Sequence, residues 1–107
     1  MNLKEIQKEQ NAWARKNFGK SETWQPLLGA VEELGELAHA HLKESQKIRT
    51  NENHEVNAKD AVGDVVIYLM DYCNLRGWCF QSIIEETWNH VKKRDWNKNK
   101  ESGADDG

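Results

Sequence analysis

Apolar side chains recur at helical spacing along most of the chain, and this pattern predicts four main helices. The first is expected at about 2–17, the second at roughly 26–44, the third at roughly 57–75 and the fourth at 81–100. Polar stretches separate them, and no segment alternates as a half-buried strand would. We therefore predict an all-α protein, a bundle of four to five helices.

Short signals at the ends of these segments support the assignment. Asn2 and Glu5 stand in capping-box register at the start of the first helix. Gly19 is suited to the positive φ that closes this helix. Ser82 and Glu85 repeat the capping-box register and are expected to open the fourth helix.

The second expected helix has two apolar sides. At about 100° per residue its main core stripe contains Leu28, Val31, Leu34, Gly35, Ala38 and Leu42. Leu37 and Ala40 point almost opposite and form a second apolar surface. The glutamates Glu32, Glu33 and Glu36 occupy the strip between the two sides. A broad solvated face would place them elsewhere, so their position needs an explanation.

The third expected helix carries an acidic stripe of Asp60, Asp64 and Asp71. Apolar side chains cover most of its remaining circumference, which predicts burial on nearly every side. Acidic stripes on neighbouring helices would repel one another, and each buried, unpaired carboxylate would cost several kcal/mol. Mg²⁺ resolves this conflict because it prefers carboxylate oxygens, and carboxylates at i, i+3 or i, i+4 reach the same ion.

Composition narrows the classes of protein that fit. The chain has 107 residues, a formal net charge of −3 and a pI near 5.8, which argues against binding of polymeric nucleic acid. We expect one domain over 1–98 and a disordered tail at 99–107. The longest apolar run, at 65–70, is too short to span a membrane, and no signal-peptide layout opens the sequence. With Cys73 and Cys79 as buried free thiols, a cytoplasmic location is expected.

At its acidic residues the sequence resembles the all-α nucleoside triphosphate pyrophosphohydrolases of the MazG-like family. The family signature is E-E-x-x-E on one helix and E-x-x-D on a later one. The first part is matched by Glu32, Glu33 and Glu36. In the second part, KDAVGDVVIYL, Asp64 occupies the final aspartate position, but Ala61 replaces the usual glutamate and the acid stands at Asp60. This D-x-x-x-D form resembles the compact, phage-like, single-domain members.

The resemblance extends over about 3–98 and includes WQPLLGAVEELGELAHAHLK, SQKIR and ETWNHVKKRDW. It implies Mg²⁺-dependent hydrolysis of a nucleoside or deoxynucleoside triphosphate to the monophosphate and pyrophosphate, with Mn²⁺ able to substitute. Such a reaction would serve nucleotide-pool control or house-cleaning. The expected metal ligands are Glu32, Glu33, Glu36, Asp60 and Asp64. Glu33 is angled furthest from the aspartates and is expected to take the proton of the attacking water.

The rest of a nucleotide needs cations for its phosphates and aromatic groups for its base. Candidate phosphate ligands are Lys43, Arg49, Lys93 and Arg94, although each also fits a solvated surface charge. Candidate base-binding residues are Trp13, Asn17 and Trp24. The chain contains five tryptophans, and core or interface packing is the alternative explanation for each.

The apolar third helix and the second apolar surface of the preceding helix predict a homodimer or homotetramer. Two other functions fit parts of the pattern. Glu36 and His39 form the Glu-x-x-His unit of di-iron carboxylate bundles, but no second unit follows. A non-enzymatic helical interaction module, with the acids as a surface patch, is the other alternative.

Overall fold

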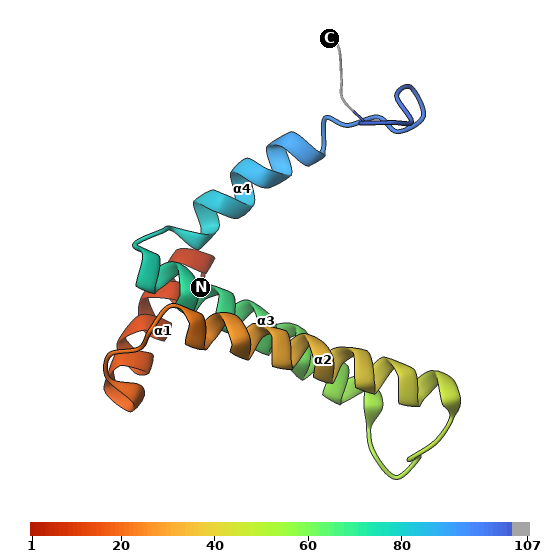
Figure 1. Ribbon diagram of the computed structural model, residues 1–107, viewed down its shortest axis with the longest axis horizontal. Helices are drawn as coiled ribbons and strands as arrows, with labels where there is room; N and C mark the ends of the chain where they lie inside the picture. The colour runs from red at the N-terminus through yellow and green to blue at the C-terminus, as the bar shows by residue number, and fades with distance from the viewer. Residues whose placement is uncertain (104–107) are drawn as a thin grey trace.

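The computed structural model describes residues 1–103, which form four helices and no strand (Figure 1). These are α1 (Leu3–Phe18), α2 (Trp24–Gln46), α3 (His54–Arg76) and α4 (Phe80–Val91). The long helices α2 and α3 run antiparallel and side by side, and α1 packs against the C-terminal half of α3. The prediction of an all-α chain is confirmed for these residues, and none of their helices has the length and hydropathy to cross a membrane.

Most helix ends follow from local signals. Asn2 Oδ1 accepts a hydrogen bond from the Glu5 N–H at 2.9 Å, and Gly19 closes α1 with a φ of 67°. Both features were predicted. Helix α3 begins three residues before its expected start because Asn53 Oδ1 accepts from the Val56 N–H at 3.1 Å and caps it.

The prediction of a fourth helix over 81–100 is wrong at both ends. Helix α4 is capped at Cys79, so Ser82 lies inside it, and it ends at Val91. Beyond the helix, Asp95 Oδ1 accepts from the backbone N–H groups of Asn97 and Lys98 at 3.0 and 3.2 Å. Short polar side chains that bond to their own backbone compete with helix formation, so these bonds oppose a continuation of the helix through residues 95–98.

Residues 95–103 instead form consecutive turns. The Asp95 N–H donates to the Gly103 carbonyl at 2.8 Å, and Gly103, with a φ of 65°, lies against the ring of Trp96. Of the tail predicted to be disordered, residues 104–107 lie outside the described residues. The domain boundary at residue 98 therefore stays a prediction.

The buried core sits where α1, α3 and α4 meet. Met70, Cys73 and Phe80 form its centre, and partly buried side chains pack around them, namely Leu3, Ile6, Val66 and Leu69. Burial raises the pKa of the Cys73 thiol, and Cys73 and Cys79 are both free. This cluster fixes the base from which α4 projects away from the other helices (Figure 1).

A polar network beside the core holds α1 to α3 and to the start of α4. Gln7 Nε2 donates to Asn74 Oδ1 at 2.9 Å and to the Trp78 carbonyl at 2.8 Å. Gln7 Oε1 accepts from the Phe80 N–H at 2.8 Å. Because Gln7 is buried and both ends of its amide are used, this residue specifies how the three helices join.

The contact between α2 and α3 uses small residues. Gly29, Ala30 and Ala40 of α2 are buried, and the ring of Tyr68 lies against Gly29 where any larger side chain would collide with it. The absence of a side chain at Gly29 therefore lets the two helices approach closely. Ala40, one of the two residues of the predicted second apolar surface, is buried against α3. At about 100° per residue it lies on the same face as Glu33 and Glu36, so the prediction that the glutamates are set apart from this surface is wrong.

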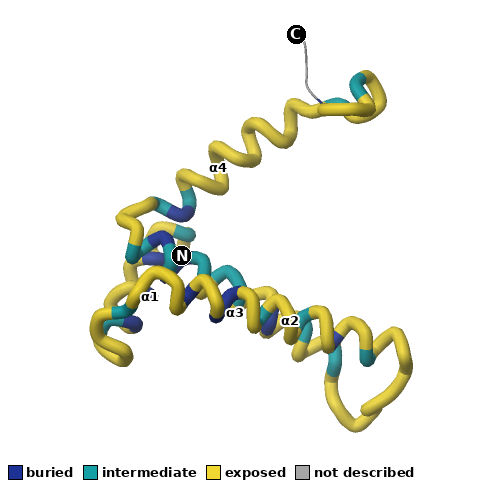
Figure 2. Tube along the Cα trace, viewed as in Figure 1, coloured by how far each residue is buried: buried dark blue, intermediate teal, exposed yellow. Residues whose placement is uncertain are grey.

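The predicted core stripe of α2 is exposed, and this prediction is wrong for the single chain (Figure 2). Leu28, Val31 and Leu34 are 52%, 60% and 57% exposed. Helix α3 is likewise not buried on nearly every side, since Val62 is 52% exposed. The Cα radius of gyration is 17.5 Å, whereas a compact domain of this length has about 13 Å. The described chain is therefore open and leaves much apolar surface uncovered.

Candidate functional site

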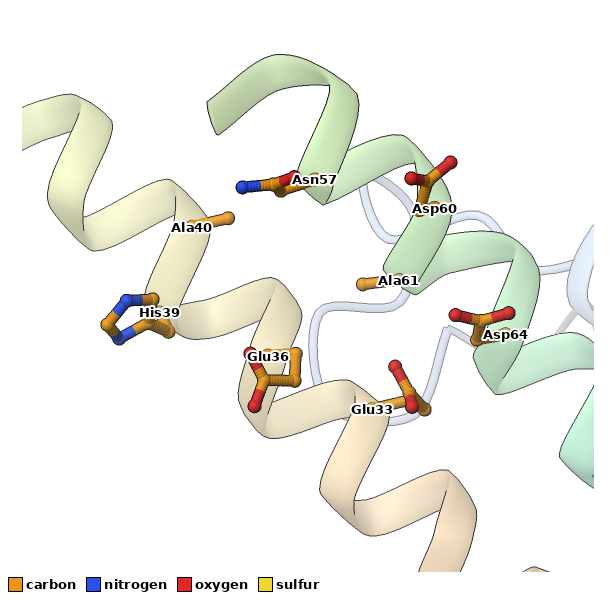
Figure 3. A pocket seen from close by; sticks show the side chains of 8 residues that line it. All are labelled: Glu33, Glu36, His39, Ala40, Asn57, Asp60, Ala61 and Asp64. Carbon is orange, nitrogen blue, oxygen red and sulfur yellow. The ribbon is translucent and has the colours of Figure 1, made fainter. Parts of the chain in front are cut away.

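A cavity of about 200 Å³ lies between α2 and α3, and acidic side chains line it (Figure 3). Its lining residues are Glu33, Glu36, His39, Ala40, Asn57, Asp60, Ala61 and Asp64. On each helix these residues follow i, i+3 and i+4 spacing, so they share one face. Ala40 and Ala61 are both buried where the helices face each other, and their small side chains leave the space that the cavity occupies.

The carboxylates approach the cavity from both helices. Glu33 and Asp64 point toward each other across the gap between α2 and α3 (Figure 3), so the prediction that Glu33 is angled furthest from the aspartates is wrong. Glu36 and Asp60 spread away from this pair, and His39 lies further along α2 (Figure 3). Four of the five predicted metal ligands therefore line one cavity. Glu32 lies on α2 next to Glu33 but does not line it.

The site has an uncompensated negative charge. Partial desolvation raises the pKa of Glu33, and repulsion from Asp64, Glu36 and Glu32 raises it further. The ion pairs within residues 1–103 are Arg15–Asp71, His54–Glu52 and Lys59–Glu55, so none of them neutralises these four acids or Asp60. Like charges held this close disfavour ionisation of the group between them.

The acids suit a hard cation by their chemistry and are not yet arranged around one. Among residues 1–103, no three His, Cys, Asp or Glu side chains converge as a group of metal ligands. Carboxylates without a counter-charge repel and turn apart, as Glu36 and Asp60 do (Figure 3). The oxygen donors that line the cavity are nevertheless those that Mg²⁺ prefers. Rotation of these side chains is what binding would require.

The predicted phosphate ligands lie outside this cavity. Lys43 Nζ donates to Gln46 Oε1 at 3.3 Å on α2. Arg49 is exposed in the connection between α2 and α3, where it has a φ of 52°. Lys93 and Arg94 follow α4 and line a separate cavity of about 500 Å³ with other basic side chains. Helix α4 carries these last two away from the α2–α3 pair (Figure 1).

The predicted base-binding residues separate into two places. Trp13 lines a second cavity of about 180 Å³ between α1 and α3, and Asp64 of the acidic cavity lines this one too. Asn17 is exposed and its side-chain amide donates to the Trp13 carbonyl at 2.8 Å. Trp24, the first residue of α2, is 58% exposed and lines neither cavity.

Some lining residues were missed from the sequence. Asn57, at the expected start of the third helix, was not among the predicted site residues, although it stands three residues before Asp60 on the same helical face. Asp71 was grouped with the other aspartates, but it pairs with Arg15 at 2.8 Å and lines the second cavity. Its pairing depends on the placement of α1, which no spacing within α3 reveals.

Comparison of this chain with protein-family models, with curated proteins and with solved structures finds no match.

Proposed function

We propose that this protein hydrolyses a nucleoside or deoxynucleoside triphosphate to the monophosphate and pyrophosphate with Mg²⁺. The observation that carries the proposal is the set of unpaired carboxylates from α2 and α3 that line one cavity. A cation bound there removes the repulsion that raises the pKa of Glu33. The resemblance of the acidic motifs to MazG-like enzymes agrees with this reading.

The acidic residues have two roles in this proposal, metal binding and proton transfer. Glu36, Asp60 and Asp64, with Glu32 beside them, hold the metal. Mg²⁺ supplies positive charge that neutralises the triphosphate and polarises its α-phosphorus. Glu33 lines the cavity beside the other acids and accepts the proton of the attacking water.

The cations for the β- and γ-phosphates come from a second copy in this proposal. Among residues 1–103, no lysine or arginine lines the acidic cavity, whereas Lys92, Lys93 and Arg94 cluster beyond the end of the projecting α4. Helix α4 also exposes an apolar stripe that includes Trp88, which is 59% exposed. Packing this stripe on the exposed leucines of a partner's α2 covers both surfaces and brings opposite charges together.

This arrangement makes the active form a homodimer or a dimer of dimers. Sedimentation at micromolar concentration is expected to show the oligomer. A stable monomer that retains full turnover would contradict it.

The reaction is tested by incubating the protein with each common NTP and dNTP in Mg²⁺ and separating the products. We expect at least one substrate to give its monophosphate and pyrophosphate in equal amounts. Diphosphate with orthophosphate, or no turnover of any nucleotide, would overturn the proposal. The same panel identifies the preferred sugar and base.

The exposed apolar surface also favours a second candidate function, a non-enzymatic interaction module. In that case the acids are a surface patch, and millimolar Mg²⁺ would leave thermal stability almost unchanged at constant ionic strength. The enzyme proposal expects stabilisation, because an ion that binds the folded chain shifts unfolding by mass action.

A further inference from the structure

The cavity between α1 and α3 has aromatic walls. Trp13 and Phe18 of α1 meet edge to face, with ring centroids 5.5 Å apart and planes at 84°. Ile67 and Tyr68 of α3 line the same space. Its volume of about 180 Å³ suits one flat ring system, and aromatic side chains stack favourably on such rings.

Two polar side chains within this apolar lining are fixed in orientation and incompletely bonded. Asp71 is 8% exposed, and within residues 1–103 its carboxylate accepts only from Arg15 Nη2, at Oδ1 and 2.8 Å. Gln10 is also 8% exposed, and its Oε1 accepts from Asn74 Nδ2 at 2.8 Å. These bonds leave the second oxygen of Asp71 to accept and the Gln10 NH₂ to donate. The cavity thus offers one acceptor and one donor, each held by a neighbour.

The position of Asp64 connects this cavity to the acidic one. Asp64 lines both, so a molecule in the aromatic cavity lies beside the carboxylates between α2 and α3. A nucleotide has this same layout, with a flat base at one end and metal-bound phosphates at the other.

We propose that the α1–α3 cavity holds the nucleobase and selects a ring edge with an N–H donor next to an acceptor. The N–H of the base donates to the free oxygen of Asp71, and the acceptor of the base accepts from the Gln10 NH₂. Trp13 stacks on the ring. This inference rests on the proposed nucleotide substrate and names the residues that read its base.

An apolar side chain from a second copy is a poorer occupant. It would bury the free oxygen of Asp71 and the Gln10 NH₂ without partners, which is unfavourable, particularly for a charged group. A base edge satisfies both groups at once. Sites built to hydrogen-bond a substrate reject analogues that lack the matching group far more strongly than apolar pockets do.

The test measures binding without chemistry. AMP, GMP, CMP and UMP are titrated at millimolar concentration into the full chain without Mg²⁺, and the indole N–H signals of its five tryptophans are followed by NMR. We expect at least one nucleotide to shift the Trp13 signal. Trp13→Ala should weaken that nucleotide roughly tenfold, from the loss of stacking. Trp78→Ala, which removes a partly exposed tryptophan outside the cavity, should leave its affinity unchanged.

A change in the ligand avoids any effect of mutation on folding. The nucleotide that binds is compared with a derivative in which methylation removes every hydrogen of the N–H group that would donate to Asp71, for example 3-methyl-UMP against UMP or N6,N6-dimethyl-AMP against AMP. We expect binding at least about tenfold weaker. Equal affinity for the methylated nucleotide, or no shift of Trp13 by any of the four, would overturn the base pocket.

These outcomes separate this inference from the hydrolysis. Monophosphate binding at Trp13 with no triphosphate turnover would refute the enzyme and keep the pocket. Turnover with an unchanged KM in Trp13→Ala would refute the pocket and keep the enzyme.

Discussion

Helix α3 carries acids in two different settings. Asp71 is buried, pairs with Arg15 at 2.8 Å and lies beside the amide network of Gln7, Gln10 and Asn74. Asp60 and Asp64, further toward the N-terminus, are exposed and have no ion pair within residues 1–103. The charge of Asp71 is therefore neutralised by a partner within the chain. The charges of Asp60 and Asp64 add to those of the neighbouring glutamates.

This difference separates charges that stabilise the fold from charges that are available to a ligand. A paired acid at a helix junction contributes to the joining of α1 and α3, whereas acids held close together without counter-charges repel one another and lower the stability of the chain. Proteins keep such clusters where a ligand supplies the missing charge.

The largest effect is expected on turnover. Asp64→Ala or Glu36→Ala removes a metal ligand and should reduce kcat/KM by about 10³-fold or more, since several kcal/mol of charge stabilisation is lost. Helical content by circular dichroism should stay unchanged. Glu44→Ala, an exposed position on the same helix outside the cavity, should retain activity. Full activity in Asp64→Ala would remove this residue from the site.

The next effect is expected at the compensated end of α3. Gln7→Leu leaves the Phe80 N–H, the Trp78 carbonyl and Asn74 Oδ1 without their partner, which should cost about 2–4 kcal/mol. The midpoint of thermal unfolding should fall by roughly 10 °C or more. Lys8→Leu, at an exposed neighbour, should change it little. An unchanged midpoint in Gln7→Leu would show that the network does not join the helices.

A metal ion should act only at the end of α3 that carries Asp60 and Asp64, and so raise the free energy of unfolding. Mg²⁺ at a hundred times its dissociation constant should stabilise the chain by about 2.7 kcal/mol, measured by thermal unfolding at constant ionic strength. Asp64→Asn should lose most of this gain, and Glu44→Gln should keep it. Equal stabilisation of both variants would indicate general screening and no specific site.

The smallest effect concerns Glu33. Because its pKa is raised by partial desolvation and by the neighbouring acids, the folded chain binds more protons than the unfolded chain just above the ordinary glutamate pKa. Stability therefore falls as pH rises through that window. Glu33→Gln should unfold at a higher temperature than the natural chain at neutral pH without metal. The difference should disappear below the ordinary glutamate pKa, and a difference that stays constant with pH would contradict this cause.

The acidic cavity was largely predictable because its residues obey local rules. Glu33 and Glu36 share a face through their spacing, as do Asp60 and Asp64, and a helix reproduces that geometry wherever it packs. The predicted base and phosphate ligands were not brought together, because they lie on α1, α4 and a connection whose placement depends on contacts distant in sequence. Gln10 and Asp71 illustrate this, since only the packing of α1 on α3 makes them neighbours.

The sequence by itself determined the four helices, most of their ends and the acidic faces of α2 and α3, because spacing and capping act within a few residues. Tertiary structure decided which of the two apolar sides of α2 meets α3. The leucine side looked like the core, but the side with Gly29 and Ala40 allows the closer approach. Tertiary structure also set Asp71 apart from Asp60 and Asp64. Whether a carboxylate is neutralised within the chain or is free to bind a ligand depends on which side chains the packing brings next to it.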